Sequence, residues 1–188
     1  GLYDFQSSCV AEMKKRDRYF ICLSPGMGKT VTVSVYLQHM QFDNVIIIAP
    51  KALHYVWREH LIKYLAIDPQ IRPNQYMGGL VVTNSQQIDK IDTSYKIDCL
   101  IVDESILFKN KKSVSFRRLK HLSNFADKIF LLSGSPYSKN ISDIWAQLNI
   151  LYPKIFSSYW DFAKIFCSVN IDRYGWQVGD NLPESEDL

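Results

Sequence analysis

Residue types that can hold the phosphate groups of a nucleotide occur together in Leu23-Ser24-Pro25-Gly26-Met27-Gly28-Lys29-Thr30. Glycine lets a backbone approach phosphate oxygens closely, because it has no Cβ atom. A lysine in this position can reach the β- and γ-phosphates, and the hydroxyl that follows it can bind Mg²⁺. An apolar run precedes the segment and a helix-length segment follows it, which is the context that a phosphate loop requires. We therefore predict a phosphate loop here; the alternative is a glycine-rich turn with a surface lysine.

An acidic pair, Asp103-Glu104, follows the apolar run 97–102. Beside a phosphate loop, the first carboxylate is suited to hold Mg²⁺, in part through water. The second carboxylate is suited to orient and deprotonate an attacking water, as a general base must. We predict that this acidic motif and Lys29 carry the catalysis of nucleotide hydrolysis. The alternative is a helix N-cap followed by a solvated acid.

Small and polar residues also follow the other apolar runs, and ligands of an open α/β sheet bind beyond the carboxyl ends of its strands. Hydroxyls around a glycine could sense the γ-phosphate, or could simply form a turn. Short polar groups at two further strand ends could contact a nucleic-acid backbone. The candidate γ-phosphate sensors are Ser133, Gly134 and Ser135, and the candidate backbone contacts are Pro50, Lys51, Thr83 and Ser85.

Five apolar runs must position these residues, and most of them are continuous rather than alternating. Such runs are typical of strands covered on both faces. They alternate with helix-length segments, which predicts an α/β domain with a mainly parallel sheet. The predicted strands are 19–23, 45–49, 80–83, 97–102 and 128–132, and the predicted helices are 31–40, 52–66, 141–151 and 157–167.

Composition fits one globular domain. The chain has 188 residues, of which 47% are hydrophobic and 22% charged, and its net charge is +3. No apolar run approaches the ~20 residues of a membrane span, so we expect a cytoplasmic protein with no membrane partner. The four cysteines are too scattered for a zinc site, and we expect Cys22 and Cys99 to be core residues. The basic stretch 109–120 either faces phosphates or forms a solvated helix face.

The order of the motifs resembles the first motor lobe of superfamily-two helicases, and most closely the Swi/Snf-type ATP-dependent DNA translocases, particularly their prokaryotic and bacteriophage members. The motifs are Gln6, SPGMGKT, IIIAPKAL, VVTNSQQI, IVDESILFKN and LLSGSPYSKN. The resemblance implies a three-layer RecA-like lobe over 1–168, with 169–188 a tail leading toward a second lobe. It implies that ATP and Mg²⁺ are the cofactors and that DNA, more often duplex than single-stranded, is the partner.

The resemblance also implies a role for each matching residue. Gln6 would read adenine, and the phosphate loop would hold ATP. Asp103 and Glu104 would serve metal and water. The full assignment is Gln6, Pro25, Gly26, Met27, Gly28, Lys29 and Thr30 for ATP; Thr30 and Asp103 for Mg²⁺; Ser133, Gly134 and Ser135 for coupling; and Pro50, Lys51, Thr83 and Ser85 for DNA.

Three departures from the family pattern bear on these expectations. Leu23 replaces the first glycine of the strict phosphate-loop pattern, which points away from small kinases and GTPases. Ile106 stands where a histidine is frequent, which puts in doubt the usual polar link between the acidic motif and the coupling motif. Tyr3 stands where an arginine is frequent.

A second RecA-like lobe, in the same or a partner chain, would supply arginines that reach the γ-phosphate. We expect this chain alone to bind ATP but to hydrolyse it slowly, in a prokaryotic or phage-infected cell. Two alternatives stay open: a nucleic-acid binding module with a degenerate ATPase site, and an unrelated phosphate-loop NTPase or kinase.

Overall fold

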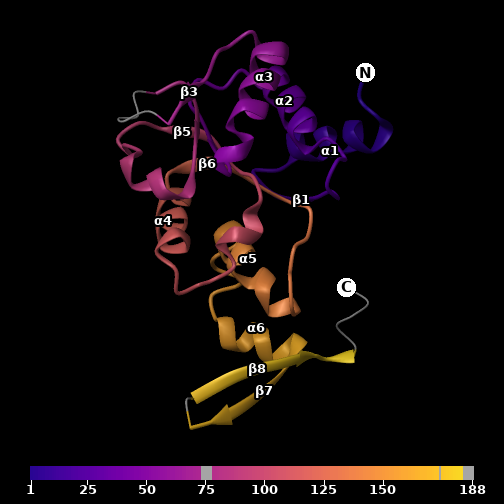
Figure 1. The fold of residues 1–188 in the computed structure, drawn as a ribbon, viewed down its shortest axis with the longest axis vertical. Helices are drawn as coiled ribbons and strands as arrows, with labels where there is room; N and C mark the ends of the chain where they lie inside the picture. Colours follow the sequence, from indigo (N-terminus) through magenta and orange to yellow (C-terminus); the bar gives the residue numbers. More distant parts are fainter. Residues whose placement is uncertain (73–77, 174, 184–188) are drawn as a thin grey trace.

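The computed structural model describes residues 1–72, 78–173 and 175–183. Its centre is a parallel sheet of six strands in the order β1-β6-β5-β2-β4-β3 (Figure 1). The strands are β1 (Arg18–Cys22), β2 (Val45–Ile48), β3 (Gln70–Ile71), β4 (Leu80–Thr83), β5 (Ile97–Val102) and β6 (Ala126–Ser133). The predicted α/β class with a mainly parallel sheet is therefore confirmed.

Helices cover both faces of this sheet and complete the three layers. One face is covered by α1 (Asp4–Lys15), α2 (Lys29–His39) and α3 (His54–Leu65), which share one apolar cluster with the strands. The other cluster includes side chains of α4 (Val114–Ser123), α5 (Trp145–Leu151) and α6 (Tyr159–Phe166). The short 3-10 helices are η1 (Lys51–Leu53), η2 (Ser85–Lys90), η3 (Ser105–Phe108) and η4 (Ile141–Ile144). None of the helices in the described residues is long and apolar enough to cross a membrane.

Strand β5 shows why the apolar runs are continuous. Cys99 and Ile101 pack into the cluster beneath α1–α3, whereas Leu100 and Val102 pack into the opposite cluster. Successive strand side chains point to opposite faces, and both faces are covered here, so all four residues have 0% exposure. A strand with one face open to water would instead show alternating apolar and polar residues.

The register of the strands places the predicted motifs at one edge of the sheet. Cys22 at the end of β1 lies opposite Ser133 at the end of β6. At the end of β2, Ile48 lies opposite Thr83 on one side and Val102 on the other. The phosphate loop, the acidic motif and the loops after β2, β4 and β6 therefore all begin at the same edge, as expected for parallel strands.

The expectation that Cys22 is a core residue is wrong, because its side chain is exposed. Within the described part of the chain, β1 is an edge strand whose one partner is β6, so it has less cover than the central strands. Cys99 lies in the central strand β5 and is buried, as expected.

Part of the predicted tail forms a hairpin. Strands β7 (Cys167–Asp172) and β8 (Gly175–Asn181) pair in antiparallel fashion, at the end of the molecule far from α1–α3 (Figure 1). Asn140 Nδ2 donates to the carbonyl of Gly179 at 3.3 Å, which attaches β8 to the start of η4. The proposed boundary after residue 168 falls inside β7. The division into lobe and tail stays a prediction, and residues 174 and 184–188 of the tail lie outside the described residues.

Candidate nucleotide-binding site

The loop between β1 and α2 has the backbone shape of a phosphate loop. Gly26 and Gly28 have φ angles of +81° and +74°, in the left-handed region that glycine enters without steric cost. Gly28 is the N-cap of α2, an 11-residue helix that starts at Lys29. The first N–H groups of a helix have no intrahelical partner and offer a site for an anion. The loop therefore fits the predicted phosphate-binding role.

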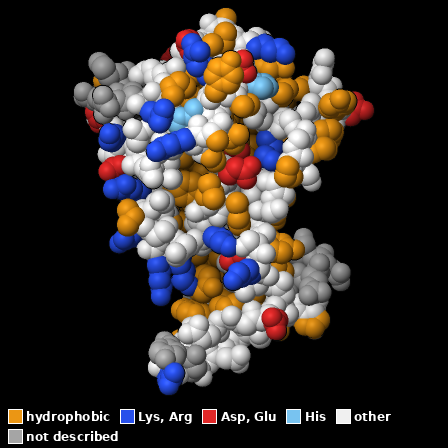
Figure 2. Space-filling view, in the orientation of Figure 1, with side chains coloured by type: hydrophobic (Ala, Val, Ile, Leu, Met, Phe, Trp, Pro, Cys, Tyr) orange, Lys and Arg blue, Asp and Glu red, His pale blue; other side chains and the backbone are white. Residues whose placement is uncertain are grey.

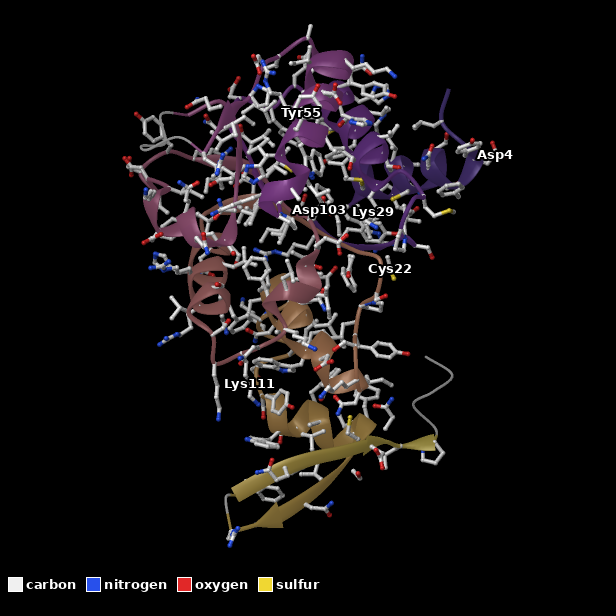
Figure 3. All side chains as sticks on the ribbon, viewed as in Figure 1. Asp4, Cys22, Lys29, Tyr55, Asp103 and Lys111 are labelled. Carbon is white, nitrogen blue, oxygen red and sulfur yellow. The ribbon has the colours of Figure 1, made fainter. Side chains whose placement is uncertain are left out.

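Lys29 projects back over this loop. Its Nζ donates to the carbonyl of Leu23 at 2.9 Å, and its side chain is half-buried. Lys29 lies near enough to Asp103 at the carboxyl edge of the sheet for its charge to act on that carboxylate (Figure 3). Phosphate oxygens are stronger acceptors than a backbone carbonyl because they are charged. The amine can therefore exchange the Leu23 carbonyl for a phosphate with little change elsewhere.

Gln6 reaches the phosphate loop from α1. Its Nε2 donates to the carbonyl of Met27 at 3.1 Å, and its Oε1 accepts from the backbone N–H of Tyr3 at 3.0 Å. The side chain is 5% exposed, and a Cβ at Gly28 would lie only 2.5 Å from its Nε2. Gln6 thus holds the phosphate loop in place. The Gln6 amide keeps a second N–H and further lone pairs that adenine could use. Adenine recognition by Gln6 stays a prediction.

Asp103 is a buried carboxylate, with 4% exposure. Burial raises its pKa, while hydrogen bonds from Trp57 and from the Glu104 N–H, and the charge of Lys29, act to lower it. Trp57 Nε1 donates to Oδ2 at 2.9 Å, and the Glu104 N–H donates to Oδ1 at 2.9 Å. A buried carboxyl whose ionised form is disfavoured gains from a bound cation, so the site fits Mg²⁺.

We predict that Trp57→Phe lowers the free energy of unfolding by about 1.5–3 kcal/mol, since hydrogen bonds to charged groups contribute about that much. Trp57 is fully buried, and the variant removes a donor to a carboxylate that has few others. Urea denaturation at pH 7 measures the effect.

The matched control for this prediction is Trp145→Phe. Trp145 is also buried, at 6% exposure, but its Nε1 has no hydrogen-bond partner among the described residues. The control loses the same ring atoms without losing a bond. Equal losses in the two variants would contradict the contribution of the Trp57–Asp103 bond.

Glu104 has a strained backbone. Its φ and ψ are both 50°, in the left-handed region that costs an L-residue with a Cβ atom about 1–2 kcal/mol. Such strain persists where the surrounding structure enforces it, and it is concentrated at functional sites. The conformation places a partly exposed carboxylate directly after Asp103, which fits the predicted general base.

The coupling loop, residues 133–136, packs against the phosphate loop. A Cβ at Gly134 would lie 3.0 Å from Pro25 Cδ and 3.5 Å from Lys29 Nζ, so a larger residue here would push against Pro25. Ser133 is fully buried, and its Oγ donates to the carbonyl of Ser135 at 2.7 Å. Because the Ser133 hydroxyl is used within the loop, the exposed Ser135 is the better placed of the two to meet a ligand. The coupling role itself stays a prediction.

A cavity of ≈ 300 Å³ lies beyond the ends of β2, β4 and β5. Pro50, Lys51 and Ser85 line it together with Asp103, so three of the four predicted DNA contacts share an opening with the acidic motif. Thr83 does not fit the expected contact with DNA. Its side chain is 2% exposed and its hydroxyl donates to Gln87 Oε1 at 3.3 Å, because the last residue of a central strand is still inside the sheet.

His54 is a residue whose role sequence reasoning missed. Its side chain is 5% exposed, and its Nε2 lies 3.1 Å from the carbonyls of both Ala49 and Thr83. Burial lowers its pKa, which favours the neutral ring. His54 therefore fixes the ends of β2 and β4 relative to each other. No sequence signal identified this role, since a single histidine in a helix has many environments.

Two lysines of the basic stretch 109–120 make contacts with other parts of the protein. Lys109 Nζ contacts Ser138 and lies 3.4 Å from Asp143 Oδ2. Lys111 Nζ lies 2.6 Å from the ring centroid of Tyr159 and 4.7 Å from that of Trp160, and burial lowers its pKa to about 8. Lys and Arg side chains are concentrated around α4 and its flanking loops on the face drawn in Figure 2. The stretch is therefore neither wholly solvated nor wholly free for DNA.

Comparison with known proteins agrees with this geometry. Residues 79–175 match the family model described as the SNF2-related domain. The chain is 25% identical to the DNA annealing helicase and endonuclease ZRANB3 of Bos taurus, over 93% of this chain and 18% of that protein. It is also 25% identical to the SWI/SNF-related matrix-associated actin-dependent regulator of chromatin subfamily A-like protein 1 of Xenopus tropicalis, over 98% of this chain and 21% of that protein. The chain thus spans about a fifth of the length of these relatives.

Part of the Sulfolobus solfataricus SWI2/SNF2 ATPase core in complex with dsDNA has the same fold as this chain, with a TM-score of 0.73 at 20% identity. The match covers 88% of this chain and 39% of that chain. The predicted RecA-like lobe is therefore confirmed as a fold.

Proposed function

This chain belongs to the SNF2-related domain family, and on that premise we propose that it is the ATP-binding lobe of an ATP-dependent DNA translocase. The lobe binds ATP beside the carboxyl edge of its sheet. Hydrolysis of that ATP then drives movement along DNA in the complete motor.

One observation carries this proposal: the contact of the coupling loop with the phosphate loop, beside the acidic motif. A Cβ at Gly134 would lie within 3.5 Å of Lys29 Nζ, and the charge of Lys29 acts on the buried Asp103. The three loops come from separate strands, yet a nucleotide at the phosphate loop would lie within reach of all of them. An ordinary glycine-rich turn requires no such convergence.

We assign the residues as follows. The N–H groups from Gly26 to Thr30 and the amine of Lys29 bind the phosphates, and Gln6 reads adenine. Thr30 and Asp103 hold Mg²⁺, which would supply positive charge to the phosphate oxygens when bound. Glu104 accepts a proton from the attacking water. Pro50, Lys51 and Ser85 face the DNA backbone from the shared cavity.

The complete motor includes a second RecA-like lobe, in the same or a partner chain. The comparison with the Sulfolobus solfataricus ATPase core supports this proposal, because the match covers 39% of that chain. An arginine supplied from outside a nucleotide site can raise kcat by ~10³–10⁵-fold. That ATPase core is in complex with dsDNA, which supports duplex DNA as the partner of this chain.

The prokaryotic or phage setting, with its cytoplasmic location, stays a hypothesis without support from the curated relatives. ZRANB3 and the subfamily A-like protein 1 named above come from Bos taurus and Xenopus tropicalis.

Measurement of ATP hydrolysis with and without duplex DNA tests the proposal. We expect this chain alone to bind ATP with Mg²⁺ but to turn it over at least ~10³-fold more slowly than the intact protein with DNA. Robust DNA-stimulated turnover by this chain alone would reject the need for a second lobe. DNA binding by the intact protein without any ATP binding would favour the binding module with a degenerate ATPase site.

A further inference from the structure

Gln147 of α5 joins two of the loops at the nucleotide site. Its side chain is fully buried. Ser105 Oγ donates to Gln147 Oε1 at 2.6 Å, and Gln147 Nε2 donates to the carbonyl of Pro136 at 2.7 Å. Ser105 follows the acidic motif directly, and Pro136 closes the coupling loop. One amide therefore connects the two loops through both of its ends.

Chemistry fixes the orientation of this amide. A backbone carbonyl only accepts hydrogen bonds, so the group that faces Pro136 must be the NH₂ of Gln147. Rotating the amide by half a turn would set two oxygens against each other in a buried position. Ser105 then has to donate to Oε1, and Ser105 is itself fully buried. Neither bond can be exchanged for water without opening the core, and unpaired buried polar groups are costly.

The connection extends to the phosphate loop. Ser105 is the residue after the strained Glu104, so its position sets where the Glu104 carboxylate lies. At the other end, the coupling loop touches Pro25 through Gly134. A displacement of the phosphate loop would therefore pass to the acidic motif through Gln147. Ile106, the next residue, has no polar side-chain group with which to form a parallel link.

We propose that Gln147 is a positioning residue that makes the acidic motif and the coupling loop move together, and so couples nucleotide binding to DNA binding. This inference rests on the proposed function. Coupling of two binding sites is a free energy shared between them, and it appears as a change in the affinity for one ligand when the other is bound. Gln147 contacts neither ligand in this assignment. Its replacement should therefore alter the change in affinity for one ligand that binding of the other causes.

The test is Gln147→Leu in the intact protein, since leucine fills similar space without either bond. The affinity for a non-hydrolysable ATP analogue with Mg²⁺ is measured by calorimetry with and without duplex DNA. We expect the two affinities of the unmodified protein to differ by about 5–150-fold. In Gln147→Leu we expect the ratio of the analogue affinities with and without duplex DNA to fall to within about twofold, because the two loops no longer move as one.

Asn149→Leu is the matched control. Asn149 lies on the same helix and is 1% exposed, and its Nδ2 donates to the carbonyl of Phe156 at 2.7 Å, away from both loops. This variant also removes a buried amide and its hydrogen bond, so it measures the effect of such a loss outside the two loops. It should keep the ratio of the unmodified protein, whatever its stability.

Ser105→Ala keeps the inference testable if Gln147→Leu does not fold, since it removes one hydroxyl and leaves the bond to Pro136. We expect it to lower the ratio as well. An unchanged ratio in either folded variant would overturn the inference, as would an equal fall in Asn149→Leu. Absence of ATP binding by the unmodified protein would instead reject the proposed function.

Discussion

Replacement of Lys29 by alanine is expected to weaken ATP binding by about 10²–10⁴-fold. The amine would bond to two phosphates, and hydrogen bonds to charged groups contribute about 1.5–3 kcal/mol each. The sum, about 3–6 kcal/mol, converts at 1.4 kcal/mol for each factor of ten. Calorimetry with ATP and Mg²⁺ measures the change directly.

The fold of Lys29→Ala should survive, because among the described residues the Lys29 amine donates only to the carbonyl of Leu23, in a partly exposed loop. A thermal melt within a few degrees of the unmodified protein confirms this. Lys14→Ala, at an exposed position on α1, is the control for loss of a positive charge. Equal ATP affinity in Lys29→Ala and the unmodified protein would contradict the phosphate-loop assignment.

Glu104→Gln should lower the rate of ATP hydrolysis by about 10²–10⁴-fold, the usual contribution of a general base. Glutamine keeps the size and the backbone strain of the residue but accepts a proton poorly. ATP binding should change little, since Lys29 and the phosphate loop are intact. The expected pattern in steady-state kinetics of the intact protein with DNA is a fall in kcat without a matching rise in KM.

Glu59→Gln is the control for this effect. Glu59 is exposed on α3, so the same chemical change there should leave kcat unaltered. If Glu104→Gln kept most of its turnover, another group would have to accept the proton from water, and the assignment of the acidic motif would be wrong.

Sequence patterns predicted that the candidate site residues lie together, because parallel strands bring their carboxyl ends to one edge. Buried runs identified β2, β4 and β5, and the residues after each run then lie at one edge of the sheet. The prediction that Cys22 is buried was wrong because an apolar run does not distinguish the edge strand β1 from a central strand. The exposure of Cys22 follows from the single neighbour of β1 in the described sheet.

Helix α4 and the β7–β8 hairpin have sequence patterns typical of their structures. Ser113 precedes α4 and accepts a hydrogen bond from the Phe116 N–H at 3.1 Å, as an N-cap serine does. Phe116, Leu119 and Leu122 recur at helical spacing. In the hairpin, Val169 and Ile171 alternate with polar residues, and Gly175 follows closely, a pattern typical of strands joined by a turn.

The hydrogen bonds between distant segments have no comparable sequence pattern. Trp57 lies 46 positions from Asp103, and Gln147 lies 42 positions from Ser105. Trp57 and Gln147 also fit the apolar or neutral face of a helix, α3 and α5 respectively. Only the packing of α3 and α5 against the sheet selects which strand end they reach, and that depends on the whole fold.

The strain at Glu104 has a consequence for anyone who engineers this protein. Residue 104 has a left-handed backbone, which glycine adopts without the steric cost that a Cβ brings. Selection for heat resistance alone would therefore reward glycine at this position, and would discard the carboxylate assigned to activate water. Stability and turnover compete at this residue, so a thermostability screen of this protein needs an activity filter from its first round.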